Sequence, residues 1–273
     1  MSEAQAKGAV IVTGATFGIG KDVALLLAER GWPVVAFGLQ AAQISSVATA
    51  DVGALQRDAQ AQGLPLTFVE GDVTSEADVA GIVALAASKH EAIFGLINNA
   101  AIGPLGTVMD TAPDVWDHIH AVNLKGPYLA ARAVIPHMLR SGGGRIVNVG
   151  SGAGWGKPNM AAYAASKGGL VALSAALALD HFADRIAVNT IIPGGGGIHS
   201  GMSLGRVDGD LARLRANAIG SVAGRHTTGA DLAKAVAFLL SEDAAAISGT
   251  IIDVGCFAHQ GSSQPSAPAK QGA

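Results

Sequence analysis

The stretch Thr13-Gly-Ala-Thr-Phe-Gly-Ile-Gly20 follows a short apolar run and precedes a segment with helical periodicity. Its glycines, Gly14, Gly18 and Gly20, permit positive φ and let backbone N–H groups approach a ligand closely. The start of the following helix would add free N–H donors and the positive end of its dipole, which suit a pyrophosphate. The spacing Gly-x-x-x-Gly-x-Gly differs from the dinucleotide fingerprint Gly-x-Gly-x-x-Gly. The stretch by itself therefore leaves both a tight turn and a nucleotide-binding loop open.

Beyond this turn, short apolar runs alternate with longer segments of helical period along the chain. Such alternation indicates an α/β fold with a doubly wound parallel sheet of about seven strands and helices on both faces. No linker interrupts it before His259, so we expect one domain over residues 1–258 and a flexible tail over residues 259–273. The expected strands are Ala9–Thr13, Pro33–Phe37, Leu66–Val69, Phe94–Ile97, Arg145–Val149, Ile186–Ile191 and Thr250–Val254, and the expected helices are Ile19–Arg30, Ala41–Gln62, Glu76–Lys89, Pro113–Ser141, Met160–Phe182 and Ala230–Leu240.

The composition excludes several classes of function. A net charge of −3 gives no electrostatic footprint for nucleic acid. No run approaches the ~18 apolar residues of a membrane span, and the first eight residues do not form a signal peptide. The single cysteine, Cys256, excludes an intramolecular disulfide and a multi-cysteine metal site. We therefore expect a soluble cytoplasmic protein without a nucleic-acid or membrane partner. No metal site is expected either, because no compelling ligand set is formed by His118, His120, His137 and His181.

A second informative stretch is Tyr163-Ala-Ala-Ser-Lys167, which lies inside an expected helix. Residues four apart lie on one helical face, so both side chains can enter the same cleft. A phenol has a pKa near ~10, and a neighbouring cation favours its phenolate form. The pair therefore has the parts of a general acid and base. The alternative interpretation is a solvated lysine beside a packed tyrosine.

Together with Asn98-Asn99-Ala100 after the fourth expected strand, the two stretches resemble the short-chain dehydrogenase/reductase family. The resemblance extends from about Lys7 to Gly255 and depends on several motifs in the right order. It implies a single-domain Rossmann-type fold. It also implies an NAD(P)-dependent oxidoreductase that interconverts a secondary alcohol and a ketone by hydride transfer, with Tyr163 as general acid and base.

The resemblance assigns four catalytic residues. Tyr163 exchanges the proton of the substrate hydroxyl, and Lys167 lowers the tyrosine pKa and holds the nicotinamide ribose. Ser151, at the end of the fifth strand, orients the substrate oxygen; its alternative interpretation is a serine in a strand-end turn. Asn123, in the helix after the Asn-Asn-Ala turn, would hold a water that links Lys167 to solvent; otherwise it is an ordinary helix asparagine.

The family's cofactor contacts fall on several turns of this chain. Asp72 matches the acidic residue near the adenine, although it is equally natural as a helix cap. The family usually has glycine where this chain has Ala101. The implied cofactor-binding residues are Gly14, Thr16, Phe17, Gly18, Ile19, Gly20, Gly38, Leu39, Asp72, Val73, Asn99, Ala100, Tyr163, Lys167, Pro193, Gly194 and Ile198.

The chain departs from the family where the choice between NAD and NADP is made. An acid at the end of the second strand would hold the ribose hydroxyls and repel a 2′-phosphate, but Gly38 stands there. The basic residues common in NADP enzymes are replaced by Leu39 and Phe17. The cofactor is thus NAD or NADP, and the missing carboxylate favours NADP. Lys21 is a candidate for an added positive charge.

The second departure follows Pro193-Gly194. The threonine expected to contact the carboxamide is Ile198, so Ser200 or the backbone of Ile198 would take its role. We expect a mobile lid over the substrate at about residues 198–220. Its apolar contacts would come from Met202, Leu204, Leu211 and Leu214, and its possible anion partners are Arg206, Arg213 and Arg215, although a solvated amphipathic helix is an equally natural interpretation. Further candidates for the pocket are Gly103, Gly152, Trp155 and Asn159.

Two alternatives to a dehydrogenase stay open. One is a nucleotide-binding regulator that has lost turnover, and the other is an epimerase or dehydratase on the same fold. The resemblance also implies a homotetramer or homodimer, packed through the long helices expected at Pro113–Ser141 and Met160–Phe182.

Overall fold

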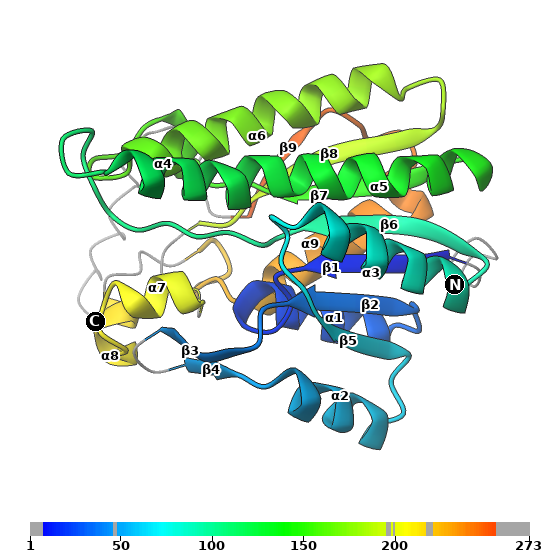
Figure 1. The fold of residues 1–273 in the computed structure, drawn as a ribbon, viewed down its shortest axis with the longest axis horizontal. Coiled ribbons are helices and arrows are strands. Elements are labelled where there is room, and N and C mark those ends of the chain that lie inside the picture. Colours follow the sequence, from blue (N-terminus) through cyan, green and yellow to red (C-terminus); the bar gives the residue numbers. More distant parts are fainter. Residues whose placement is uncertain (1–7, 46–47, 195–197, 199, 217–220, 255–273) are drawn as a thin grey trace, which may run out of the picture.

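The computed structural model describes residues 8–45, 48–194, 198, 200–216 and 221–254. Seven parallel strands form one sheet in the order β5-β2-β1-β6-β7-β8-β9, with helices on both faces (Figure 1). The expected doubly wound α/β fold is confirmed. The strand order reverses between β1 and β6, and this is where open α/β sheets bind ligands. The strands are β1 (Gly8–Thr13), β2 (Val34–Gly38), β5 (Leu66–Glu70), β6 (Ala92–Asn98), β7 (Gly144–Val149), β8 (Ile186–Ile192) and β9 (Ile251–Asp253).

Successive residues of a buried strand supply the two opposite faces of the sheet. In β1, Val10 and Val12 pack into the core under α1, α2 and α9, whereas Ile11 packs into the core under α3, α5 and α6. All six residues of β1 are buried, as expected for a central parallel strand. The helices are α1 (Gly18–Glu29), α2 (Val52–Ala61), α3 (Glu76–Lys89), α4 (Pro113–His120), α5 (Gly126–Arg140), α6 (Ala161–Asp180), α7 (Gly201–Gly205), α8 (Leu211–Ala216) and α9 (Gly229–Leu240).

The prediction of one helix over Ala41–Gln62 is wrong. A two-stranded antiparallel hairpin, β3 (Ala41–Ser45) and β4 (Ala48–Ala50), comes first, and α2 begins only at Val52. The reason is the helix start at Asp51, whose carboxylate accepts the N–H of Ala54 at 2.9 Å. The Gln40 side chain also accepts the Val52 N–H at 2.9 Å. An N-cap of this kind marks the beginning of a helix, so the preceding residues belong to another element.

The prediction of one α-helix over Pro113–Ser141 is also incomplete. A π-helical turn (Ala121–Lys125) separates α4 from α5, and the Gly126 N–H donates to the Ala121 carbonyl five residues earlier. Pro127 explains the change, because proline has no N–H to donate to the carbonyl of Asn123. Turns of this kind often occur at functional sites.

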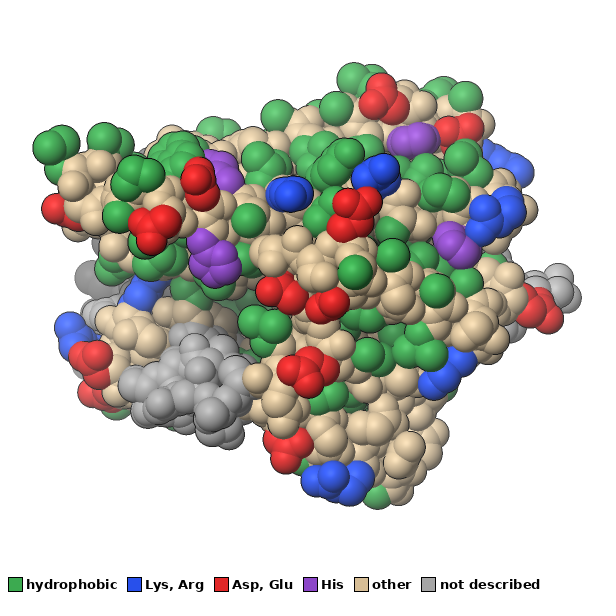
Figure 2. Space-filling view, in the orientation of Figure 1, with side chains coloured by type: hydrophobic (Ala, Val, Ile, Leu, Met, Phe, Trp, Pro, Cys, Tyr) green, Lys and Arg blue, Asp and Glu red, His purple; other side chains and the backbone are tan. Residues whose placement is uncertain are grey.

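By length and composition alone, α6 would also pass as a membrane span among the described residues, with a mean hydropathy of 1.4. From the sequence we expect no run of this kind. The apolar character comes largely from alanines and leucines, and α6 lies along β8 and the π-helical turn in the layer above the sheet (Figure 1). Acidic and basic side chains are interspersed over the face seen in Figure 2, without a continuous basic area there.

Candidate active site

The ends of β1 and β6 are fastened together by Thr13 and Asn99. The Thr13 hydroxyl accepts the N–H groups of Asn99 and Ala100, each at 3.0 Å. In return, the Asn99 amide donates to the carbonyls of Thr13 at 3.1 Å and Gly14 at 3.0 Å. The Asn99 side chain therefore stabilises the glycine turn through two hydrogen bonds to its backbone. Thr13 was not among the predicted site residues, although its position directly before Gly14 was the available signal.

The glycine turn fits a dinucleotide phosphate. Gly14 and Gly18 have φ angles of 62° and 60°, which favour glycine. A Cβ at Gly14 would lie 2.6 Å from the Ala100 Cα, and one at Gly20 would collide with the Gly14 carbonyl oxygen. Phe17 is the N-cap of α1 and its side chain caps no N–H group. The first N–H groups of α1 are thus left without a side-chain cap, as an anion site requires.

At the end of β2, Gly38 lies against the glycine turn. A Cβ at Gly38 would lie 3.0 Å from Thr16 Oγ1 and 3.2 Å from Thr16 Cγ2. Thr16 is buried, whereas the uncharged Leu39 side chain is 55% exposed. The carboxylate that the family often has at position 38 is therefore absent, and the Thr16 side chain fills part of the space that it would occupy.

Asp72 and Val73 follow β5. The Asp72 carboxylate accepts the Thr74 N–H at 2.8 Å, while the cap of α3 is Ser75, which accepts the Asp78 N–H. Ser75, and not Asp72, is therefore the N-cap of α3. Val73 is buried against the start of α5, where a Cβ at Gly126 would lie 3.1 Å from the valine side chain.

Three predicted catalytic residues come together where β7 ends and α6 begins. The Ser151 hydroxyl lies near enough to the Tyr163 phenol to lower its pKa. Lys167 donates from Nζ to the Val149 carbonyl at 2.8 Å, and its Nζ lies 6.0 Å from the centroid of the Tyr163 ring. Both α6 side chains are buried. Spacing along one helix and one strand end is enough to produce this cluster.

Burial perturbs both ionisable groups of the cluster. It raises the pKa of Tyr163, an effect opposed by the neighbouring Ser151 hydroxyl and by the positive charge of Arg206. It lowers the pKa of Lys167 from 10.5 to about 8. Perturbed groups of this kind in a shared cleft are typical of catalytic sites. Arg206 was predicted only as a possible anion partner, and its effect on Tyr163 was missed.

Asn123 lies in the π-helical turn and is fully buried. Its Oδ1 accepts the Ile102 N–H at 2.9 Å, and its Nδ2 donates to the Ile102 carbonyl at 2.8 Å and to Ser166 Oγ at 3.0 Å. Ser166 in turn donates to the Tyr163 carbonyl at 2.8 Å. Asn123 thus ties the segment after β6 to the helix that carries Tyr163 and Lys167. Ser166 was not predicted, although it is the polar residue directly before Lys167.

The segment after β8 begins with Pro193 and Gly194, both partly buried. The rest of the predicted glycine run, residues 195–197, lies outside the described residues. Ile198 has its side chain in the apolar core, and its backbone carbonyl accepts the Ser203 hydroxyl. Ser200 is the N-cap of α7, where its hydroxyl accepts the Ser203 N–H at 3.1 Å. Helix capping therefore already engages the hydroxyl that was considered as a replacement for threonine.

The predicted lid contains α7 and α8 and touches two parts of the site. Met202 packs against the cluster of Ala153, Met160 and Tyr163. Phe17 of the glycine turn packs against the lid cluster, which we define as Leu204, Val207 and Leu214. Positions 199 and 217–220 of the predicted lid, and the predicted tail, lie outside the described residues.

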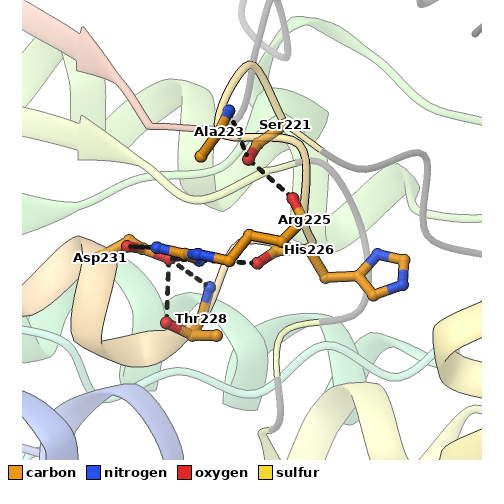
Figure 3. A network of polar contacts seen from close by, with 6 residues as sticks. All are labelled: Ser221, Ala223, Arg225, His226, Thr228 and Asp231. Atoms are coloured by element: carbon orange, nitrogen blue, oxygen red, sulfur yellow. Dashed lines mark hydrogen bonds and ion pairs between the residues drawn. The ribbon is translucent and has the colours of Figure 1, made fainter.

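Beyond the lid, a polar network leads into α9 (Figure 3). Arg225 donates to both carboxylate oxygens of Asp231 at 2.7 Å. The same carboxylate accepts the N–H and hydroxyl of Thr228, each at 2.9 Å, and so closes a capping box at the start of α9. The network fixes where the chain enters α9.

Comparison with known proteins identifies the family of the chain. The model of the short chain dehydrogenase family matches residues 8–204. The chain belongs to the short-chain dehydrogenase family. It is 34% identical over 251 residues to 2-(S)-hydroxypropyl-CoM dehydrogenase 3 of Xanthobacter autotrophicus, and the match covers 90% of this chain and 94% of the relative.

Two solved structures of this dehydrogenase family are similar in fold. One is the 3-ketoacyl-(acyl-carrier-protein) reductase of Brucella melitensis complexed with NADH, at 31% identity and a TM-score of 0.76, covering 90% of this chain and 96% of that one. The other is a single-substitution variant of the actinorhodin polyketide ketoreductase with NADPH, at 26% identity and a TM-score of 0.80, covering 93% and 98%. The predicted family, fold and enzymatic nature are confirmed, and the two complexes support a nicotinamide cofactor.

Proposed function

We propose that this dehydrogenase interconverts a secondary alcohol and a ketone, with Tyr163 as the group that exchanges the proton of the substrate oxygen. The observation that carries the proposal is the Ser151–Tyr163–Lys167 cluster at the carboxyl end of the sheet. When bound, a nicotinamide cofactor supplies or takes up the hydride. The residues that would hold it are the glycine turn and α1 start for the phosphates and Lys167 for the ribose.

Each residue of the cluster has a distinct part in the proposed mechanism. The Ser151 hydroxyl orients the substrate oxygen toward the phenol of Tyr163. In reduction Tyr163 gives its proton to that oxygen, and in oxidation its phenolate takes the proton. Lys167 favours the phenolate by its charge. Asn123 keeps the cluster in place through Ile102 and Ser166, so its replacement would disturb both contacts.

For the cofactor we propose a preference for NADP. Gly38 offers no carboxylate to repel a 2′-phosphate, and the neighbouring Thr16 hydroxyl is an uncharged donor at the same place. For the whole protein we propose a cytoplasmic homotetramer or homodimer of single-domain subunits with a short substrate lid and a flexible tail. Light scattering of the purified protein measures the assembly.

The proposed function is tested by following nicotinamide absorbance with NADH and NADPH against a panel of ketones and alcohols. We expect turnover of at least one pair. Binding of both cofactors without turnover of any substrate would favour a regulator, while conversion of a substrate without net change in cofactor would favour an epimerase or dehydratase.

Tyr163→Phe separates binding from chemistry. The ring that lines the site remains, so we expect cofactor affinity to stay near the wild-type value, while turnover falls by roughly 100-fold or more because the proton donor is lost. Lys167→Ala should weaken both cofactor binding and rate. Undiminished activity of Tyr163→Phe would refute the assignment of the proton-transfer group.

A further inference from the structure

Arg206 follows α7 and reaches into the substrate side of the site. Its Nη2 donates to the Gly103 carbonyl at 3.1 Å. Gly103 in turn lies directly against the catalytic cluster, since a Cβ there would come within 2.9 Å of Tyr163 Cδ2 and 2.8 Å of Met202 Sδ. Met202 and Arg206 are four residues apart at the end of one helix, which places both on the same face. The guanidinium is therefore held beside Tyr163 by backbone and helix geometry.

The charge of Arg206 has no acidic partner within the part of the chain that the structure describes. The ion pairs found there join other residues: Arg132 with Glu76, His181 with Asp184 and Arg225 with Asp231. Partial burial lowers the pKa of Arg206, and the neighbouring Tyr163 raises it. A guanidinium that lacks an acidic partner can pair with an anionic group of a ligand.

Arg206 also keeps donors for such a ligand. A guanidinium carries five N–H donors in a planar fork, and Gly103 accepts from one nitrogen, Nη2. The residue remains exposed, so a molecule in the site can reach it. The planar fork matches carboxylate, sulfonate or phosphate oxygens, with charge-assisted bonds that are stronger than neutral ones.

We propose that Arg206 is a specificity-determining residue that binds an anionic group on the substrate, so that the preferred substrate is an alcohol or ketone with a carboxylate or a similar anion close to the reacting carbon. This inference rests on the proposed function, because it assigns Tyr163 to the reacting oxygen. The position of Gly103 against Tyr163 and Met202 assigns the anion to the substrate and not to a cofactor phosphate.

Matched substrates test the proposal. Levulinate and its methyl ester differ mainly in one negative charge, and each is offered to the wild type, Arg206→Gln and Arg206→Lys. We expect Arg206→Gln to reduce the ratio of kcat/KM for levulinate over the ester by roughly 10- to 100-fold, mainly through KM. Arg206→Lys should retain part of the preference, because a charge remains without the fork.

Arg213→Gln is the matched control, because it removes the same charge from an exposed position on α8 of the same lid. We expect it to leave the substrate ratio near the wild-type value. An equal fall in both glutamine variants would show a general effect of lid charge and overturn the proposal. So would an unchanged ratio in Arg206→Gln, or weaker NADPH binding with an unchanged ratio, which would assign the arginine to a cofactor phosphate.

A binding measurement keeps the inference separate from the proposed function. Ligand-observed NMR titration with propanesulfonate and with propanol requires no turnover. If neither ketone is reduced, the proposed function fails for them, but sulfonate binding that is lost in Arg206→Gln and kept in Arg213→Gln would still support the anion site. Sulfonate binding that is unchanged in Arg206→Gln, or absent from the wild type, would overturn it.

Discussion

Two cationic side chains lie near the Tyr163 phenol and differ in how they respond to pH. Lys167 has its Nζ bound to the Val149 carbonyl, and burial lowers its pKa to about 8. It therefore begins to lose its charge in mildly alkaline solution. Arg206 stays charged over the same range, because an arginine pKa lies far higher. At alkaline pH, the charge of Arg206, which lowers the pKa of Tyr163, therefore persists after Lys167 has lost its own.

This difference predicts a shift in the pH profile of alcohol oxidation. In the proposed mechanism, oxidation needs the Tyr163 phenolate as proton acceptor, so kcat/KM should rise with pH through the tyrosine pKa. Removing the nearby cation in Arg206→Gln disfavours phenolate and should move this rise to higher pH by roughly one unit. The measurement is the pH dependence of kcat/KM for a neutral alcohol. The same shift in Arg213→Gln would mean that the effect is not local.

The contact between Gly38 and Thr16 gives a second prediction at this scale. An aspartate at position 38 would repel the 2′-phosphate of NADP, but its Cβ would press on Thr16. Gly38→Asp alone should therefore weaken the binding of both cofactors. Adding Thr16→Ala should restore NADH binding and change the NADPH-to-NADH ratio of dissociation constants by roughly tenfold or more. Fluorescence titration of the single and double variants measures the dissociation constants of both cofactors. An unchanged ratio in the double variant would show that the 2′ group of the cofactor does not lie near position 38.

At the scale of elements, the sequence predicts what depends on local repetition. The strands and most helices follow from their periods, and Tyr163 and Lys167 share a face because they are four residues apart. The only sequence signal for the π-helical turn that holds Asn123 is Pro127, which has no backbone N–H to continue an α-helix. The β3–β4 hairpin was missed because the N-cap at Asp51 was passed over. Contacts between distant segments, such as Arg206 with Gly103, have no local pattern at all.

The packing of Phe17 on the lid cluster is one such distant contact, and it links the glycine turn to α7 and α8. Phe17→Ala should weaken the packing of α7 and α8 on the glycine turn by about 1 kcal/mol, which corresponds to roughly fivefold faster amide exchange in α7 and α8. Hydrogen exchange with mass spectrometry measures this. Phe182→Ala removes the same ring at an 80% exposed position and serves as control. Equal protection in wild type and Phe17→Ala would show that the contact does not hold α7 and α8 in place.

Across the whole molecule, the sheet brings together side chains from distant parts of the sequence. Thr13 meets Asn99 across β1 and β6, and Asn98 donates to Asn148 across β6 and β7 at 2.8 Å. The parallel order places these strand ends on one edge, so the glycine turn and the Tyr163 cluster lie at the same end of the sheet. The Arg225–Asp231 pair lies at the start of α9, and its place was not anticipated from the sequence.

The Arg225–Asp231 pair should control stability at low pH. The Arg225 hydrogen bonds and the Thr228 cap hold the pKa of Asp231 below its usual value of 3.8. Because the folded-state pKa is depressed, this contribution is present above the ordinary carboxyl pKa and is lost as pH falls below it. Asp231→Asn should cost about 1 kcal/mol at neutral pH, since a cap and a partly exposed ion pair are lost together. The difference in unfolding free energy from wild type should shrink in acid.

Urea unfolding in neutral and in acidic solution measures this difference. Asp58→Asn, which changes an exposed carboxylate on α2, serves as control. A difference that stays constant between neutral and acidic solution would show that ionised Asp231 does not stabilise the fold.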